Sequence, residues 1–149
     1  MLDACQGALP ADIFVAAAAV ADWRVENAAG GKIKKTPGAA PPSIALTPNP
    51  DILATLSQPG PSRPALVVGF AAETDDLMAN AQSKRARKGC DWIVANDVSP
   101  ATGIMGGDEN AIHLITAAGV EDWPRLKKDE VARRLAERIA AEFAEPGGS

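Results

Sequence analysis

Two groups of lysines are the residues of this chain whose type and spacing best suit chemistry. Lys84 and Lys88 lie four residues apart in a predicted helix and so share one of its faces. The second group is the run Lys32–Lys35. Because the chain as a whole carries a formal net charge of −4, two local clusters of cations indicate a site for a small anion. Taken alone, each group has a plainer explanation, namely cations placed near a helix C-terminus and a solvated loop.

Other candidate residues also have ordinary structural explanations. Asp22 follows a predicted strand and Asp51 opens a predicted helix, and both are common positions for a capping acid. Phe70, just after a strand, is more often a core residue than a platform for a base. His113 is the only histidine, and without a GxSxG motif we interpret it as structural. Neither GxGxxG nor a Walker A motif is present, so the sequence contains no standard phosphate-binding loop.

One predicted βαβ unit, between Pro64 and Val98, organises the chain. An apolar run breaks at Gly69, a helix starts after Thr74 and ends at Gly89, and a second apolar run follows. Ligands of parallel sheets bind beyond the carboxyl ends of the strands, so we expect the chemistry at that rim. The residues expected there are Phe70, Glu73, Asn96 and Asp97.

The rest of the chain predicts further elements around this unit. The apolar run from Asp12 to Val20 predicts a central parallel strand. The stretch from Glu26 to Pro42 predicts a loop, and Asp129 to Phe143 predicts an amphipathic helix. The other predicted elements are a helix tail in Met1–Leu9, an edge strand at Lys32–Lys35, a strand at Ser43–Thr47, a helix from Asn49-Pro50-Asp51 to Ser57, a Gly-rich loop at Ser99–Asn110, and strands at Ala111–Thr116 and Val120–Pro124 with a turn at Ala118-Gly119.

Length and composition indicate one soluble globular domain covering residues 1–149. No apolar run approaches the roughly 20 residues of a membrane span, and no secretory signal is recognisable. Cys5 and Cys90 have neither metal-ligand spacing nor a disulfide framework, which favours reduced thiols in a cytoplasmic protein. The negative net charge argues against a nucleic-acid-binding surface.

Six short motifs follow one another along the chain. They are ADWRV (Ala21–Val25), KIKK (Lys32–Lys35), NPDI (Asn49–Ile52), GFAAET (Gly69–Thr74), the pair Lys84 and Lys88, and ANDV (Ala95–Val98). In this order they resemble the bacterial phosphopantothenoylcysteine synthetase family, which is usually the C-terminal half of a bifunctional flavoprotein of coenzyme A biosynthesis. Each motif is short, and their common order makes the resemblance specific.

The resemblance implies a reaction and its partners. Cytidine triphosphate (CTP), with Mg²⁺, activates the carboxylate of 4′-phosphopantothenate as an acyl-cytidylate, and the amine of L-cysteine then forms the amide. It further implies a homodimer, a fused decarboxylase domain in the parent chain, and a three-layer Rossmann-like α/β fold with a mainly parallel sheet and a small antiparallel strand extension.

The resemblance also implies a role for individual residues. Lys32 would be the essential catalytic lysine in a flap over the site. The implied nucleotide-binding residues are Ala16, Ala17, Ala18, Asp22, Lys32, Pro50, Asp51, Ile52, Leu53, Phe70, Lys84 and Lys88. Cationic side chains suit this chemistry because they stand where negative charge develops on phosphoryl groups.

Two departures from the family pattern lead to further expectations. The family's domain begins with a Gly-rich segment that this sequence does not contain, so we expect the C-terminal part of a ligase domain. Nothing matches the flavin-binding half, so we expect no FMN. The alternative is an inactive nucleotide-binding or dimerisation fragment. A nicotinamide-dependent reductase is disfavoured by the missing glycine fingerprint.

Overall fold

A computed structural model describes residues 1–27, 30–31, 43–99 and 107–144. Within these ranges, no helix is both long and apolar enough to cross a bilayer. In chain order, the elements are α1 (Leu2–Gly7), β1 (Ile13–Val15), β2 (Trp23–Val25), β3 (Leu46–Pro48), α2 (Ile52–Leu56), β4 (Leu66–Glu73), α3 (Leu77–Lys88), β5 (Trp92–Asp97), β6 (Glu109–Asn110), β7 (His113–Ile115), β8 (Val120–Asp122), β9 (Leu126–Lys127) and α4 (Lys128–Ala144).

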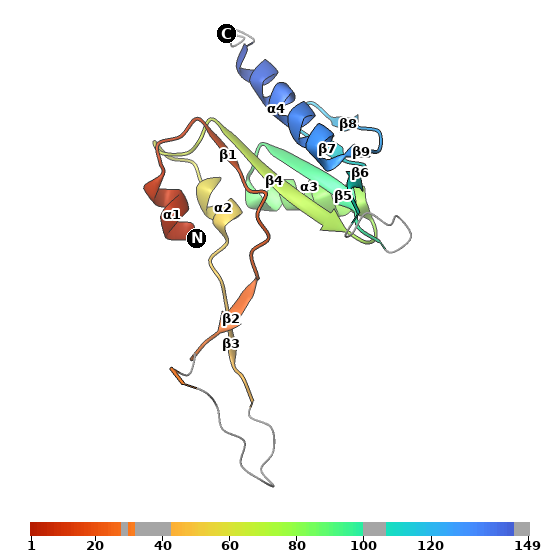
Figure 1. Ribbon diagram of the computed structural model, residues 1–149. Helices are drawn as coiled ribbons and strands as arrows, with labels where there is room; N and C mark the ends of the chain where they lie inside the picture. Colours follow the sequence, from red (N-terminus) through yellow and green to blue (C-terminus); the bar gives the residue numbers. More distant parts are fainter. Residues whose placement is uncertain (28–29, 32–42, 100–106, 145–149) are drawn as a thin grey trace.

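A five-stranded sheet in the order β1-β4-β5-β7-β8 forms the centre of the molecule (Figure 1). β1, β4 and β5 are parallel, whereas β7 is antiparallel to both β5 and β8. Four of the five strands therefore point in one direction, and β7–β8 is an antiparallel hairpin. This confirms the expected α/β fold with a mainly parallel sheet and a small antiparallel extension.

Alternating strand residues separate two hydrophobic cores on the two faces of the sheet. Val68 and Val94 pack against α4, which contributes a stripe of apolar residues four positions apart. Val67 and Ile93 face the other way and pack with residues of α2 and α3. The molecule therefore has three layers, with α4 on one face of the sheet and α2 and α3 on the other (Figure 1). The α4 stripe consists of Val131, Leu135 and Ile139.

The run from Asp12 to Val20 does not form the expected central strand. Only Ile13–Val15 is a strand, and it lies at the edge of the sheet beside β4. Ile13 and Val15 are each 39% exposed, whereas Phe14, between them, packs into the core shared with α2 and α3. The apolar sequence suggested burial on both faces, but among the described residues β1 has a neighbour on one side only.

The βαβ unit is confirmed, although two of its boundaries differ. β4 continues through Gly69 to Glu73, so Phe70 lies within the strand and not beyond it. α3 begins at Leu77 after Asp76, and Thr74 does not cap it. The expected end is correct, because Gly89 adopts the left-handed conformation (φ 71°) that terminates a helix.

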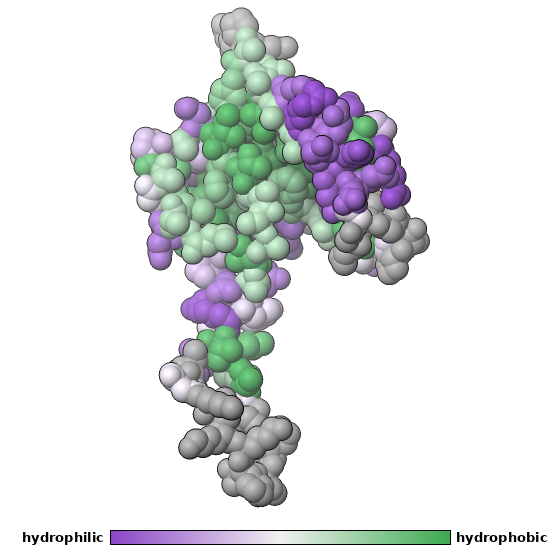
Figure 2. Space-filling view, in the orientation of Figure 1, coloured by the Kyte–Doolittle hydropathy of each residue, from purple (hydrophilic) through white to green (hydrophobic). Residues whose placement is uncertain are grey.

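β2 and β3 form a separate antiparallel ribbon that projects from the body as an arm (Figure 1). β3 is shifted from the expected Ser43–Thr47 to Leu46–Pro48. One face of the arm exposes large apolar residues, and a green area on the arm in Figure 2 marks aliphatic side chains. The exposed residues of this face are Trp23, Val25, Ile44 and Leu46. The strand predicted at Lys32–Lys35 lies outside the described residues.

The remaining predictions agree with the structure within a few residues. α1, β7, β8, the turn at Gly119 and α4 all occur where they were expected. The predicted loop at Ser99–Asn110 is wrong at its end, because Glu109–Asn110 forms β6 and pairs with β9. Residues 100–106 of that loop are not described.

Candidate functional site

The first part of the site is the start of α2. Asp51 is the capping residue of this helix, and its Oδ1 accepts a hydrogen bond from the Ala54 backbone N–H at 2.9 Å. The side chain of Asp51 therefore caps α2, which is the ordinary structural role that the sequence allowed for this acid. Pro50, directly before it, is exposed, and Ile52 is half-buried.

The position of α2 depends on close packing against the sheet. Leu53, in its first turn, is buried over Gly69 of β4. A Cβ atom on Gly69 would lie 2.5 Å from Leu53 Cδ2 and 2.9 Å from Ile93 Cδ1. Only a glycine therefore lets Leu53 approach this closely, so Gly69 serves the packing of α2 and does not end the strand.

The second part of the site is the C-terminal half of α3. Lys84 and Lys88 are both half-buried. The Lys88 ammonium pairs with Oδ2 of Asp51 and thereby joins the two helices. Lys84 forms no ion pair with any described residue. The structure thus brings Asp51 and Lys88 together from separate helices.

The ion pair changes the ionisation of Asp51. Partial burial by itself raises the pKa of this carboxyl group. The hydrogen bonds from Lys88 and from the Ala54 amide, together with the charges of Lys88 and Arg87, outweigh burial and lower the pKa below its ordinary value. Asp51 is therefore a carboxylate at neutral pH, and Lys88 is its counter-ion.

The alanines and Asp22 lie in the connection between β1 and the arm. Ala16 continues the pairing of β1, because its N–H donates to the Val68 carbonyl at 2.9 Å. Ala17 and Ala18 are exposed, as is Asp22. The backbone carbonyl of Asp22 accepts a hydrogen bond from the backbone N–H of Asn49 at 2.8 Å.

Asn49 ties the base of the arm to the start of α2. Its side-chain amide donates to the Ala21 carbonyl at 2.8 Å. Arg24 Nη1 donates to the Pro48 carbonyl at 2.7 Å and to Asn49 Oδ1 at 3.3 Å. The ADWRV and NPDI segments therefore meet, so Asp22 is held close to the residues that precede Asp51.

Phe70 does not join this group. It packs against the core on the α4 face of the sheet, whereas Leu53 and Ala81 of α2 and α3 lie on the opposite face. The structure therefore separates the Phe70 side chain from the Asp51–Lys88 pair by the thickness of the sheet. Lys32, the expected catalytic residue, lies outside the described residues.

The carboxyl rim of the sheet is a distinct place from the lysine face. α3 runs back from the rim towards the start of β5, so the backbone of Lys88 lies at the opposite end of the strands. Asp97 is at the rim, where hydrogen bonds from the backbone and the hydroxyl of Ser99 lower its pKa. The Val98 amide donates to the Glu73 carbonyl at 2.9 Å.

Two further interactions were missed at the sequence level. His113 Nδ1 lies 2.5 Å from Asp122 Oδ1, directly across the β7–β8 hairpin. The alternation around the Ala118-Gly119 turn could have shown that these residues face each other. Arg63 contacts several segments at once, and nothing in its loop sequence signals this.

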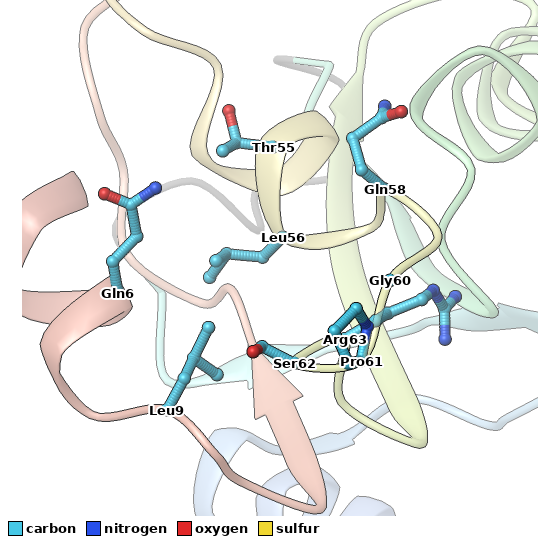
Figure 3. Close-up of a pocket in the computed structure, with 9 residues that line it drawn as sticks. All are labelled: Gln6, Leu9, Thr55, Leu56, Gln58, Gly60, Pro61, Ser62 and Arg63. Carbon is cyan, nitrogen blue, oxygen red and sulfur yellow. The ribbon is translucent and has the colours of Figure 1, made fainter.

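A small cavity of 180 Å³ lies between α1, α2 and the loop that follows α2 (Figure 3). Gln6 and Leu9 line it from one side, and Thr55 and Leu56 from the other. It is smaller than typical ligand pockets of roughly 300–1,000 Å³ and includes none of the lysines. We therefore do not assign it to the site.

The fold and the site together define a three-layer α/β domain. In this domain the cationic helix α3 lies beside α2, which is capped by Asp51 and packs against the sheet. The chain belongs to the family described as "DNA/pantothenate metabolism flavoprotein C-terminal domain", whose model matches residues 1–143. This confirms the family resemblance seen in the sequence.

Individual relatives agree with this assignment. The chain is 42% identical over 120 residues to "Coenzyme A biosynthesis bifunctional protein CoaBC" of Vibrio cholerae, covering 80% of the chain and 30% of that protein. It is 39% identical over 135 residues to the Escherichia coli K12 protein of the same name, covering 90% and 33%. The chain therefore spans about a third of the length of these relatives.

Solved structures show the same fold. The crystal structure of the C-terminal domain of CoaBC superposes with a TM-score of 0.66 and 29% identity, covering 91% of this chain and 56% of that one. A DNA/pantothenate metabolism flavoprotein from Streptococcus pneumoniae superposes with a TM-score of 0.65 at 20% identity, covering 88% and 63%, which supports the fold alone.

Proposed function

We propose that this chain is the C-terminal part of a CTP-dependent phosphopantothenate–cysteine ligase of coenzyme A biosynthesis. In the first step, a carboxylate oxygen of 4′-phosphopantothenate attacks the α-phosphorus of CTP, and the bond to pyrophosphate breaks. In the second step, the amine of L-cysteine attacks the acyl carbon. The C–O bond to cytidine monophosphate breaks, and the amine loses a proton as the amide forms.

The observation that carries this proposal is membership of the family over residues 1–143. The relatives that share this region are named as bifunctional proteins of coenzyme A biosynthesis. A ligase needs a place for an anionic nucleotide, and the α2–α3 face supplies side chains of suitable charge. Lys84 and Lys88 contribute two cations to one face of α3, and Asp51 holds one of them.

In the proposed site, the lysines act electrostatically. Lys84 and Lys88 would neutralise phosphate oxygens, and fixed positive charge is most effective where negative charge develops during phosphoryl transfer. Lys88 would then exchange or share its Asp51 partner with the nucleotide. Lys32 would act over the reacting groups, as the resemblance implies. The exposed Ala17 and Ala18 would let the nucleotide approach the backbone.

Mg²⁺ would accompany the triphosphate. Among the residues that the structure describes, no group of three or more His, Cys, Asp or Glu side chains could hold a metal. Mg²⁺ at nucleotide sites commonly keeps several waters and binds through phosphates plus one or two carboxylates, so such a cluster is not needed. We propose no FMN site in this chain.

We further propose that the chain works in the cytoplasm as a homodimer, within a fusion to a decarboxylase domain. The double activity in the name of the relatives supports the fusion. The arm supports the dimer, because an isolated two-stranded ribbon is marginally stable in water and this one exposes an apolar face. Trp23 is 57% exposed and Leu46 is 55% exposed.

The test of the proposed function is pyrophosphate release by the protein that contains this chain. We expect release that requires both CTP and 4′-phosphopantothenate, and an amide product only when cysteine is added. ATP in place of CTP serves as the nucleotide control. Release that proceeds without phosphopantothenate, or no release from a folded protein under any combination, would contradict the proposal.

A second candidate is a nucleotide-binding or dimerisation module that is inactive by itself. The exposed apolar face of the arm favours it. Both candidates bind CTP and dimerise, which calorimetry and sedimentation of the chain measure. Turnover distinguishes them, because the module would bind CTP and dimerise without forming product. Trp23→Ser should convert a dimer into a monomer, whereas Val120→Ser, at an exposed position away from the arm, should not.

A further inference from the structure

Arg63 contacts the ends of both helices that carry the candidate site. It lies in the loop between α2 and β4, and Figure 3 shows it beside the residues that follow α2. Its Nε donates to the carbonyl of Ser57, the residue that ends α2, at 3.0 Å. Its Nη2 donates to the carbonyl of Gly89, the residue that ends α3, at 3.3 Å. Nη1 donates to the Pro64 carbonyl at 2.9 Å. One side chain thus joins two helix termini.

Asp91 fixes the guanidinium of Arg63 from the other side. Both carboxylate oxygens of Asp91 lie 3.0 Å from Arg63 Nη2. Asp91 Oδ2 also accepts the Val67 backbone N–H at 2.7 Å, so the carboxylate is anchored to β4. The Arg63 and Asp91 side chains are 21% and 34% exposed, so the pair is largely shielded from solvent. Arg63 is therefore held against the start of two adjacent strands.

The two helix ends also lie close together. A Cβ atom on Gly89 would lie 3.8 Å from Ser57 Cβ and 3.9 Å from the Ser57 carbonyl oxygen, which is ordinary van der Waals contact. Ser57 itself is buried, and its hydroxyl donates to the Leu53 carbonyl at 2.7 Å. A shift at this junction would move both helices relative to each other.

The helices carry the ion pair at a short distance from this junction. α2 is only five residues long, so Asp51 lies less than two helical turns from Ser57. Lys88 directly precedes Gly89. A rotation or slide of either helix end would therefore change the separation of the Asp51 carboxylate and the Lys88 ammonium.

We propose that Arg63 is a positioning residue for the nucleotide site, because its guanidinium fixes the C-terminal ends of α2 and α3 and through them the placement of Lys88 beside Asp51. The inference rests on the proposed function, since it assigns Lys88 to the nucleotide. Arg63 does not itself contact the nucleotide in this proposal. It acts through its hydrogen bonds to the Ser57 and Gly89 carbonyls at the two helix ends.

A double-mutant cycle separates positioning from a general effect on the fold. We expect Arg63→Gln to weaken CTP binding about tenfold, as expected for the loss of one well-placed charged contact. In a Lys88→Met background, the same change should weaken CTP binding less than twofold, because the group that Arg63 positions is gone. Arg63→Lys should recover only part of the affinity, since an ammonium cannot make the planar contacts of a guanidinium.

The matched control is Arg133→Gln, which removes an arginine whose ion pairs with Glu130 and Glu137 are confined to the exposed face of α4. It should leave CTP affinity unchanged. Equal weakening by Arg63→Gln with and without Lys88 would overturn the inference in favour of a structural role. Unchanged CTP affinity in folded Arg63→Gln would also overturn it.

A measurement without nucleotide keeps this inference distinct from the proposed function. An NMR titration of the Asp51 carboxyl group should show its pKa rising towards the ordinary value in Arg63→Gln, because Lys88 is no longer held beside it. An unchanged Asp51 pKa would overturn the inference even if CTP binds. If Lys88→Met leaves CTP affinity unchanged, the assignment of Lys88 to the nucleotide fails, whatever the NMR result. Should Arg63→Gln fail to fold, Asp91→Asn weakens the same junction from the other side and is judged by the same two measurements.

Discussion

Asp51 and Lys88 lie 37 residues apart in the sequence and form an ion pair between the start of α2 and the last turn of α3. A cation in the last turn of a helix needs no function to explain it. In this structure, however, the lysine reaches to a different helix, whose own position depends on a glycine in the sheet. The ion pair therefore belongs to the candidate site and also depends on the relative positions of α2 and α3.

Lys88→Met should weaken CTP binding about tenfold, because one charge-assisted contact to phosphate is lost while the apolar stem remains. Isothermal calorimetry measures the dissociation constant. Lys127→Met, which removes an exposed lysine from β9, is the matched control and should have no effect. Equal affinities of the Lys88 and Lys127 variants would remove Lys88 from the site.

Asp51→Asn should reduce stability in a pH-dependent way. Asn is as good an N-cap residue as Asp, so the substitution removes the charge and keeps the cap. The ion pair is partly exposed, so we expect a loss of about 0.5–1 kcal/mol at neutral pH. Because the folded-state pKa of Asp51 is lowered, its contribution is fully present above the ordinary value of 3.8 and is lost as the pH falls through the folded-state pKa.

Denaturant unfolding at a series of pH values checks this prediction. The stabilities of wild type and Asp51→Asn should converge only below pH 3.8. A difference that stays constant down to low pH would show that the ionised carboxylate contributes nothing to stability.

Gly69→Ala should destabilise the fold and disturb the site together. The added methyl group overlaps Leu53 and Ile93, and overpacking of this kind costs about 1–3 kcal/mol. Because Leu53 sits in the first turn of α2, its displacement should also weaken CTP binding. Gly60→Ala, where a Cβ atom meets nothing within 4 Å, is the control for thermal unfolding and binding. Equal melting temperatures for the two variants would contradict this account of the packing.

Lys32→Gln should abolish product formation and leave the fold unchanged. This prediction rests on the family resemblance alone, since Lys32 lies outside the described residues. Product formation and circular dichroism are measured side by side, with Lys34→Gln as the neighbouring control. Turnover at the wild-type rate in Lys32→Gln would exclude this lysine from the mechanism.

Local signals in the sequence predicted the elements that end at a characteristic residue or that repeat apolar residues at a regular spacing. The end of α3 at Gly89 and the α4 stripe at Val131, Leu135 and Ile139 are examples. Gly69 was misread as a break in the strand, because the reason for a glycine there is Leu53, which comes from a different element. The sequence showed that a glycine stands at this position, but the structural reason for it lies in another segment of the chain.

The candidate site could be predicted only in part for the same reason. Four-residue spacing placed Lys84 and Lys88 on one helix face, and the motifs placed Asp51 at a helix start. No local pattern could predict that Lys88 reaches Asp51, that Phe70 faces α4, or that Arg63 links two helix ends. These relationships depend on tertiary packing, which brings together residues that are distant in the sequence.

The edge position of β1 has a practical consequence for handling the protein. Among the described residues no strand pairs with its outer side, and Ile13 and Val15 add apolar surface next to those open backbone groups. Such an edge can recruit extended segments from other molecules and seed precipitation. Light scattering of concentrated samples should therefore fall when Val15 is replaced by lysine, and any cloning boundary or fusion partner that shields this edge should improve the yield of monodisperse material.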